Sequence, residues 1–302
     1  MVTPAEEEWT DWTVIHSGFA LSDRVLDELL TGGQSFQWYR TASDSPVWIG
    51  MLGASLIELK TDQSGSVLYR TIDQAGRDRT GEDLHAFFRL DEDHAGMLAS
   101  LPLDRDPYLA RCVEHFRGLR ILRQPIEEVL LTFLCSSNKQ ISQIRRMLAK
   151  LSERWGTSHY PGWFSYPGWE ALAGASLEDL ASCGTGYRGK YIQGCAMVMR
   201  DEPDFLSAIG TLPYHEAKAK LVSLPGVGPK VAECILLYGA GCYQSFPLDT
   251  WILKAMNQRY GLSSLSRKAM EAHAHKYFGP CAGIAQQYIF AYEREVRELS
   301  RS

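Results

Sequence analysis

The sequence has 302 residues, of which 45% are hydrophobic and 22% charged. This length and composition are typical of a folded protein with a large core, and they exclude a disordered chain, a collagen and a small disulfide scaffold. The 31 Lys and Arg residues are outnumbered by 36 Asp and Glu residues, so the net charge is −5. At first sight, a mildly acidic chain argues against a nucleic-acid partner.

Short β-type segments dominate the chain up to about residue 118. Clusters of Gly, Asp and Ser separate most of them, as antiparallel strands require. The segments are 36–39, 48–52, 55–59 and 67–72. We therefore predict a small antiparallel β-sheet domain over residues 1–118.

Helical periodicity dominates the rest of the chain. The predicted helices cover 126–135, 141–155, 177–183, 191–200, 215–222, 230–240, 250–259 and 284–297. The fold class that we predict is α+β, with the β-sheet domain followed by a larger, mainly α-helical domain over residues 119–302.

Charge is unevenly distributed along the chain. Residues 1–30 contain seven acids and one base, whereas residues 117–154 contain eight bases and three acids. A polyanion meets this local field rather than the net charge, so a DNA-binding surface is compatible with an acidic chain. An ordinary solvated helix surface would carry the same charges, and charge alone leaves both interpretations open.

The cysteines predict neither disulfides nor a metal cluster. Their number is odd, and no two form a C-x-x-C pair; they are residues 112, 135, 183, 195, 234, 242 and 281. A disulfide framework, a structural zinc site and a four-cysteine iron–sulfur cluster are therefore not expected. The start of the chain is acidic, unlike a signal peptide, and no apolar run approaches the ~18 residues of a membrane span. We expect no membrane association, and a cytoplasmic, nucleoid-associated protein in a prokaryote or a nuclear one in a eukaryote.

A tight turn between two helical segments is the most informative stretch of the sequence. Gly226 and Gly228 allow the backbone to approach a ligand closely, and Pro229 suits the first position of the following helix. The free N–H groups at that helix start form an anion site, so a phosphate fits there. The pattern is that of a helix–hairpin–helix, which holds a DNA backbone without reading bases. A plain pair of helices without a ligand is the alternative.

Lys230 and Asp249 are the candidate catalytic pair. Lys230 lies at the positive end of the second helix, beside apolar side chains, and both features favour the neutral amine, which is a nucleophile. Asp249 precedes a helical segment, where it would act as an N-cap. A carboxylate fixed in this way near Lys230 could stabilise positive charge on a sugar ring.

At these residues the sequence resembles the helix–hairpin–helix DNA glycosylases, and further motifs narrow the resemblance to the 8-oxoguanine DNA glycosylase family. The resemblance extends from about Gly33 to Phe290. The motifs that carry it are GQSFQW at 33–38, LCSSN at 134–138, GYR at 186–188, KVAEC at 230–234 and AQQYIF at 285–290.

The resemblance implies a bifunctional DNA glycosylase and AP lyase that acts on double-stranded DNA containing 8-oxoguanine. Such an enzyme flips the damaged base out of the stack, since the glycosidic bond cannot be attacked inside the duplex. Lys230 would then attack C1′ of the sugar, release the base and form a Schiff base, and β-elimination would cut the strand. Asp249 would stabilise the sugar cation.

The resemblance also implies a base pocket. The carbonyl of Gly33 would accept a hydrogen bond from N7–H, which guanine lacks. Gln286 would bind the Watson–Crick edge, and Phe290 and Cys234 would lie on the two faces of the base. Gln286 and Phe290 are four residues apart and would share one helix face. Taken singly, Gln286 would also fit a surface position and Phe290 a core position.

Further residues resemble the family's DNA contacts. Asn138, Tyr187 and Arg188 match the residues that fill the gap left by the flipped base. Two positions depart from the family pattern. Gln143 replaces an arginine that contacts the orphan cytosine, so we expect weaker selectivity for the opposite base. Trp251 replaces a histidine near the flipped nucleotide's phosphate, and it cannot serve as a charged phosphate ligand.

Two alternatives compete with this assignment. One is a helix–hairpin–helix glycosylase for another damaged base, although the cysteine cluster common in those relatives is absent. The other is a non-catalytic helix–hairpin–helix DNA-binding protein, which has no need of a lysine at 230. We expect a monomer without a resident cofactor. The resemblance allows a monovalent cation at the hairpin carbonyls near Val222, Leu224 and Val227.

Overall fold

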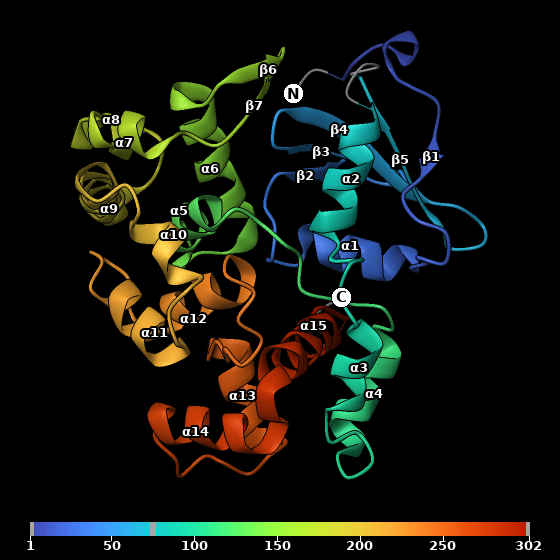
Figure 1. Ribbon diagram of the computed structural model, residues 1–302, viewed down its shortest axis with the longest axis vertical. Helices are drawn as coiled ribbons and strands as arrows, with labels where there is room; N and C mark the ends of the chain where they lie inside the picture. The colour runs from blue at the N-terminus through green and yellow to red at the C-terminus, as the bar shows by residue number, and fades with distance from the viewer. Residues whose placement is uncertain (1–2, 73–76, 300–302) are drawn as a thin grey trace.

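The computed structural model describes residues 3–72 and 77–299. Its N-terminal part contains a five-stranded antiparallel sheet with the strand order β1-β5-β4-β3-β2 (Figure 1). The strands are β1 (Thr13–Val14), β2 (Trp38–Arg40), β3 (Trp48–Leu52), β4 (Ser55–Thr61) and β5 (Val67–Thr71). The four predicted strands are therefore present, with small changes at their ends.

The N-terminal part also contains four helices that the sequence analysis did not predict. They are α1 (Asp23–Thr31), α2 (Arg77–Phe87), α3 (His94–Ala99) and α4 (Pro107–His115). Helix α1 begins at the N-cap Ser22, whose side chain accepts a hydrogen bond from the Val25 N–H at 3.3 Å. Its buried residues include Leu26 and Leu29, so its amphipathic pattern was visible in the sequence.

The second part of the chain is mainly helical, as predicted. Its helices are α5 (Ile126–Ser136), α6 (Ile141–Trp155), α7 (Trp169–Ala173), α8 (Leu177–Ser182), α9 (Gly189–Asp201), α10 (Phe205–Ile209), α11 (Tyr214–Val222), α12 (Pro229–Tyr238), α13 (Thr250–Gln258), α14 (Arg267–Phe278) and α15 (Ala282–Leu299). A short hairpin of β6 (Ser158–Tyr160) and β7 (Trp163–Phe164) interrupts them and was not predicted. The 3-10 turns are η1 (Glu6–Glu8), η2 (Gly186–Arg188) and η3 (Gly279–Cys281).

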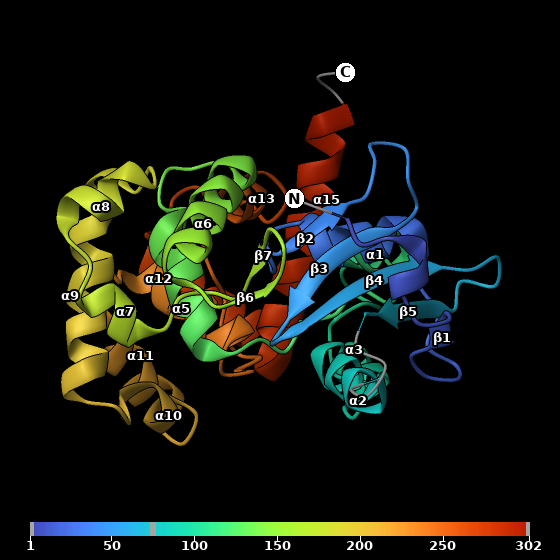
Figure 2. The ribbon, with the colours of Figure 1, turned by 90° about the horizontal axis from the view of Figure 1, so that it is seen from above.

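The two parts share one hydrophobic core. Phe36 from the strand-rich part meets Phe133 of α5 edge-on, with ring centroids 6.5 Å apart. Helix α15 packs against α4, α13 and α14, and it passes between the strand-rich part and the remaining helices (Figures 1 and 2). An ion pair between Arg294 of α15 and the buried Glu28 of α1 ties the same parts together. The division at residue 118 stays a prediction.

None of the helices in the described residues has both the length and the apolar composition needed to cross a membrane.

Candidate active site

An open cavity of about 860 Å³ lies where the two parts meet, and most of the predicted site residues line it. Its walls come from the loop after α1, from α5 and the turn that follows it, and from α6, α12, α13 and α15. The predicted site residues among its lining are Gly33, Asn138, Lys230, Cys234, Asp249, Trp251, Gln286 and Phe290.

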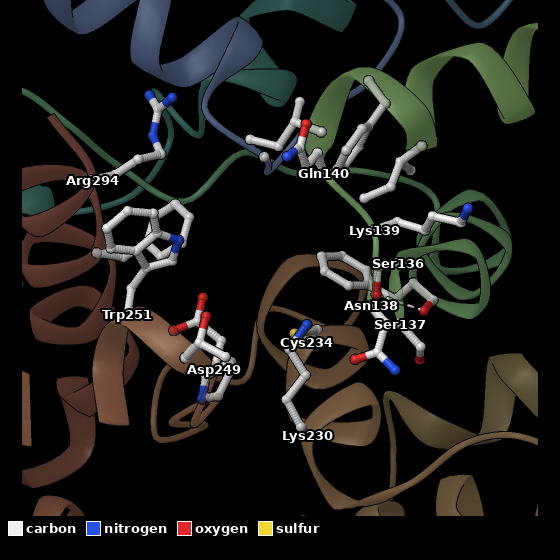
Figure 3. A pocket seen from close by; sticks show the side chains of 18 of the residues that line it. Ser136, Ser137, Asn138, Lys139, Gln140, Lys230, Cys234, Asp249, Trp251 and Arg294 are labelled. Atoms are coloured by element: carbon white, nitrogen blue, oxygen red, sulfur yellow. Dashed lines mark hydrogen bonds between the residues drawn. The ribbon is translucent and has the colours of Figure 1, made fainter. Parts of the chain in front are cut away.

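Lys230 and Asp249 both line this cavity, and their side chains lie on opposite sides of it (Figure 3). Lys230 follows Pro229 at the start of α12, and its Nζ lies 5.0 Å from the centre of the Phe133 ring. Asp249 is the N-cap of α13, as predicted, and its carboxylate accepts a hydrogen bond from the Ile252 N–H at 2.8 Å. The cap fixes the carboxylate at the cavity wall.

Burial has the largest effect on the pKa values of Asp249 and of the neighbouring Cys234. Burial raises the pKa of Asp249 above its usual range, although the Ile252 N–H and the charge of Lys230 oppose the shift. Burial also raises the pKa of the Cys234 thiol to about 11, against the opposing effect of Lys230. Cys234 is therefore a neutral thiol at physiological pH, and its side chain lies beside that of Lys230 (Figure 3).

The residues expected to bind a base are buried on the same cavity walls. Gln286 is 2% exposed, and its Nε2 donates to the Pro247 carbonyl at 3.3 Å. Its Oε1 accepts no hydrogen bond from the described part of the chain. Phe290 lies one helical turn further along α15 and is half-buried. Gly33 has a φ of 109°, which favours glycine, and a Cβ there would lie 3.4 Å from the Ile141 side chain.

The expected gap-filling residues form a cluster at the cavity edge. Asn138 lines the cavity and has a φ of 53°. The buried Arg188 donates to the carbonyl of Ser137, the neighbour of Asn138. Its guanidinium lies 4.4 Å from the centre of the Tyr187 ring, and Tyr187 is 51% exposed. An aromatic ring is thus presented to solvent directly beside the cavity.

Five predicted contacts are not among the residues that line the cavity: Tyr187 and Arg188, at its edge, and Gln143, Gly226 and Gly228. Gln143 is exposed, and its Oε1 accepts from the Gln140 N–H at 3.1 Å, which caps α6. Gly226 and Gly228 form the turn between α11 and α12, as predicted, with the Val227 N–H donating to Leu224 at 3.1 Å. Gly228 is the N-cap of α12 and provides no side-chain cap, so N–H groups at this helix start remain available to a ligand.

The cavity also contains cationic residues that the sequence analysis did not assign to the site. Among the described lining residues, six are Lys or Arg and one, Asp249, is acidic. Arg294 and Arg297 continue the helix face of Gln286 and Phe290 at helical spacing, so the sequence carried a signal for them. Arg297 lies over the Trp251 ring at 5.2 Å. The chain is acidic overall, but the cavity is lined by positive charge.

Among the described residues, no group of three or more His, Cys, Asp or Glu side chains is arranged to hold a metal ion. All seven cysteines are free thiols, and six of them are buried.

Comparisons with known proteins identify the family. Residues 19–130 match the model of the 8-oxoguanine DNA glycosylase N-terminal domain. The chain is 30% identical over 276 residues to the N-glycosylase/DNA lyase OGG1 of Arabidopsis thaliana, covering 86% of this chain and 75% of that protein. The chain belongs to the 8-oxoguanine DNA glycosylase family. It is therefore a DNA glycosylase with lyase activity.

Two microbial proteins are identical to this chain to a similar degree. A probable N-glycosylase/DNA lyase of Methanothermobacter thermautotrophicus is 30% identical over 220 residues, which are 65% of this chain and 70% of that protein. The fold matches the Clostridium acetobutylicum 8-oxoguanine glycosylase/lyase, solved with double-stranded DNA containing cytosine opposite 8-oxoG. The TM-score is 0.81 at 30% identity, over 90% of this chain and 92% of that one.

Proposed function

We propose that this enzyme excises 8-oxoguanine from duplex DNA by flipping the damaged nucleotide into the cavity and attacking its C1′ with Lys230. The observation that carries the proposal is that the amine of Lys230, the carboxylate of Asp249 and the buried amide of Gln286 line one cavity. No donor among the described residues reaches the Oε1 of Gln286, so the N1–H or N2–H of a guanine-type base would satisfy it.

The chemistry requires both catalytic residues. The neutral amine of Lys230 forms a bond to C1′ while the C1′–N9 bond breaks, and the base leaves with the bonding electrons and takes up a proton. The carboxylate of Asp249 stabilises the positive charge that develops on the sugar. The resulting N,O-acetal opens to a Schiff base as the C1′–O4′ bond breaks and O4′ takes up a proton, after which loss of a C2′ proton expels the 3′ phosphate and cuts the strand.

A single hydrogen bond supports discrimination between the damaged and normal base. 8-Oxoguanine carries N7–H, a donor, whereas guanine presents a bare N7, which is an acceptor. If the Gly33 carbonyl faces N7, guanine would place two acceptors together at a buried site, at a cost of about 1–3 kcal/mol. This cost corresponds to roughly 5–150-fold in binding, and the energy of flipping a paired guanine adds to it.

The cationic lining supports DNA as the partner. Arg294 is paired with Glu28, but Lys139, Arg145, Arg267 and Arg297 also line the cavity, and a duplex carries one phosphate charge about every 1.7 Å of its axis. The exposed Tyr187 ring, next to Asn138 and Arg188, would occupy the gap in the stack.

The test is an excision assay on duplexes that contain one 8-oxoguanine, one guanine or another oxidised base at the same position, opposite each of the four bases. We expect release of 8-oxoguanine with intact guanine as the unreactive control. Preferred release of a different damaged base would contradict the proposal and favour a helix–hairpin–helix glycosylase of other specificity. Tight binding without release of any base would favour a non-catalytic DNA-binding protein.

A further inference from the structure

The loop that carries Gly33 is joined to the helical part by one buried side chain, that of Gln34. Gln34 is 1% exposed. Its Nε2 donates to the Arg120 carbonyl at 2.9 Å, and its Oε1 accepts from the Leu122 N–H at 3.0 Å. Its own carbonyl accepts from Gln124 Nε2 at 2.9 Å. Both ends of the Gln34 amide and its backbone carbonyl are therefore engaged by one five-residue segment.

This segment leads directly into the catalytic part of the cavity. Helix α5 begins at Ile126, two residues after Gln124. It carries Phe133, whose ring lies 5.0 Å from the Lys230 amine. The Gly33 loop and the nucleophile are thus connected through Gln34, the segment 120–124 and α5. A second tie reinforces the connection, because Arg145 of α6 donates to the Leu30 carbonyl at 3.1 Å, at the end of α1.

The loop needs such an anchor because two consecutive glycines precede Gln34. Gly32 ends α1 as its C-cap, and Gly33 has a φ of 109°. Glycine restricts its own backbone less than any other residue, so the direction of the Gly33 carbonyl depends on what holds the next residue. A hydrogen bond weakens steeply as its angle departs from linearity. Discrimination by one carbonyl therefore requires that the loop stay fixed relative to the bound base.

We infer that Gln34 is a positioning residue that fixes the Gly33 carbonyl relative to Lys230 and thereby sets the selectivity for the damaged base. This inference rests on the proposed function, since it assigns base discrimination to Gly33. It separates two activities of the same site. Excision of 8-oxoguanine needs the base to be held by the Gly33 loop. A pre-formed abasic site contains no base, so its cleavage needs the Lys230 amine but not the Gly33 loop.

The experiment uses the full-length variant Gln34→Met, which has a side chain of similar length and cannot form the two amide hydrogen bonds. We expect single-turnover excision of 8-oxoguanine to fall at least tenfold, while cleavage of a duplex with a pre-formed abasic site stays within twofold of wild type. Gln124 is half-buried, and the variant Gln124→Ala removes one of the three hydrogen bonds that hold Gln34. We therefore expect a smaller loss of excision than in Gln34→Met, with unchanged cleavage at the abasic site.

Gln193→Met is the matched control. Gln193 lies in α9, and its Nε2 donates to the Ala175 carbonyl at 2.7 Å, away from the cavity lining. We expect Gln193→Met to match the wild type in both excision of 8-oxoguanine and cleavage at the abasic site. Equal losses of excision and abasic-site cleavage in Gln34→Met and Gln124→Ala would overturn the inference, because they would indicate a general structural role. Unchanged excision in both variants would overturn it as well. Failure of the wild-type enzyme itself to excise 8-oxoguanine would instead refute the proposed function.

Discussion

The two hairpin glycines are expected to differ sharply when each is replaced by alanine. Gly226 has a φ of 78°, in the left-handed region, and a Cβ there would lie 2.6 Å from Cβ and 2.7 Å from Cδ2 of Tyr191. Gly228 has a φ of −88° and a ψ of 176°, and a Cβ there meets no atom within 4 Å. The two positions are separated by one residue and share the same turn, so each serves as a control for the other.

The expected loss of stability follows from this geometry. The left-handed conformation costs a residue with a Cβ about 1–2 kcal/mol, and displacing the packed Tyr191 ring costs about 1–3 kcal/mol. We expect Gly226→Ala to lower the free energy of unfolding by roughly 2–5 kcal/mol, which for a chain of 302 residues corresponds to a fall in Tm of roughly 3–8 °C. Gly228→Ala leaves the backbone in an allowed region, so its stability should stay within about 1 kcal/mol of wild type.

DNA binding is expected to weaken in Gly228→Ala, the variant whose stability should be nearly unchanged. A methyl group on Gly228 would stand at the start of α12, where the free N–H groups would meet a phosphate. We expect Gly228→Ala to weaken duplex binding about tenfold, the equivalent of one lost hydrogen bond of about 1.4 kcal/mol. Thermal unfolding and a binding titration on both variants test this reasoning. Equal Tm values for the two variants would refute the backbone argument, and wild-type affinity in Gly228→Ala would refute the phosphate contact.

Three further predictions concern the cavity. Burial raises the pKa of Asp249, so on acidification the carboxylate becomes protonated at a pH above the ordinary carboxyl pKa of about 4. The rate of single-turnover excision should show an inflection at that pH in the wild type and none in Asp249→Asn. Identical pH profiles of the two proteins would contradict this prediction. Arg297 lies over Trp251 at the cavity wall, so Arg297→Ala should reduce the slope of log Kd against log salt by about 1, and an unchanged slope would exclude a phosphate contact. With Gln143, the rate of excision should depend only weakly on the base opposite the lesion, and Gln143→Arg should increase the preference for cytosine at that position. Strict selectivity for cytosine in the wild type would contradict this prediction.

Local sequence patterns predicted the regular elements where the hydrophobic period was clear. Strand 48–52 and helix 141–155 have the predicted bounds. Helix α2 was missed for a tertiary reason. Its sequence is polar, and it contains Gly81, which ordinarily indicates a break. In the structure, a Cβ at Gly81 would lie 2.7 Å from the Tyr69 hydroxyl, so glycine allows α2 to approach β5 without displacing the Tyr69 side chain.

The candidate site was predictable mainly where motifs mark individual residues. Lys230, Asp249 and Gln286 were named from the sequence and line one cavity, but the sequence could not show that they meet, because their elements are brought together only by tertiary packing. Gln34 illustrates the same limit. Its motif was recognised, yet its hydrogen bonds to residues about 90 positions away become visible only in the folded chain. The roles of the site residues stay predictions until they are tested.

The most direct test of the account is to trap and map the covalent intermediate. The wild-type enzyme is incubated with an 8-oxoguanine duplex and borohydride, which reduces a Schiff base to a stable amine, and the adduct is digested and its modified peptide is identified. We predict that the DNA is attached to Lys230 and that Lys230→Gln forms no adduct while it still binds the duplex. Attachment to another residue, or an undiminished adduct in Lys230→Gln, would contradict the assignment of Lys230 as the nucleophile.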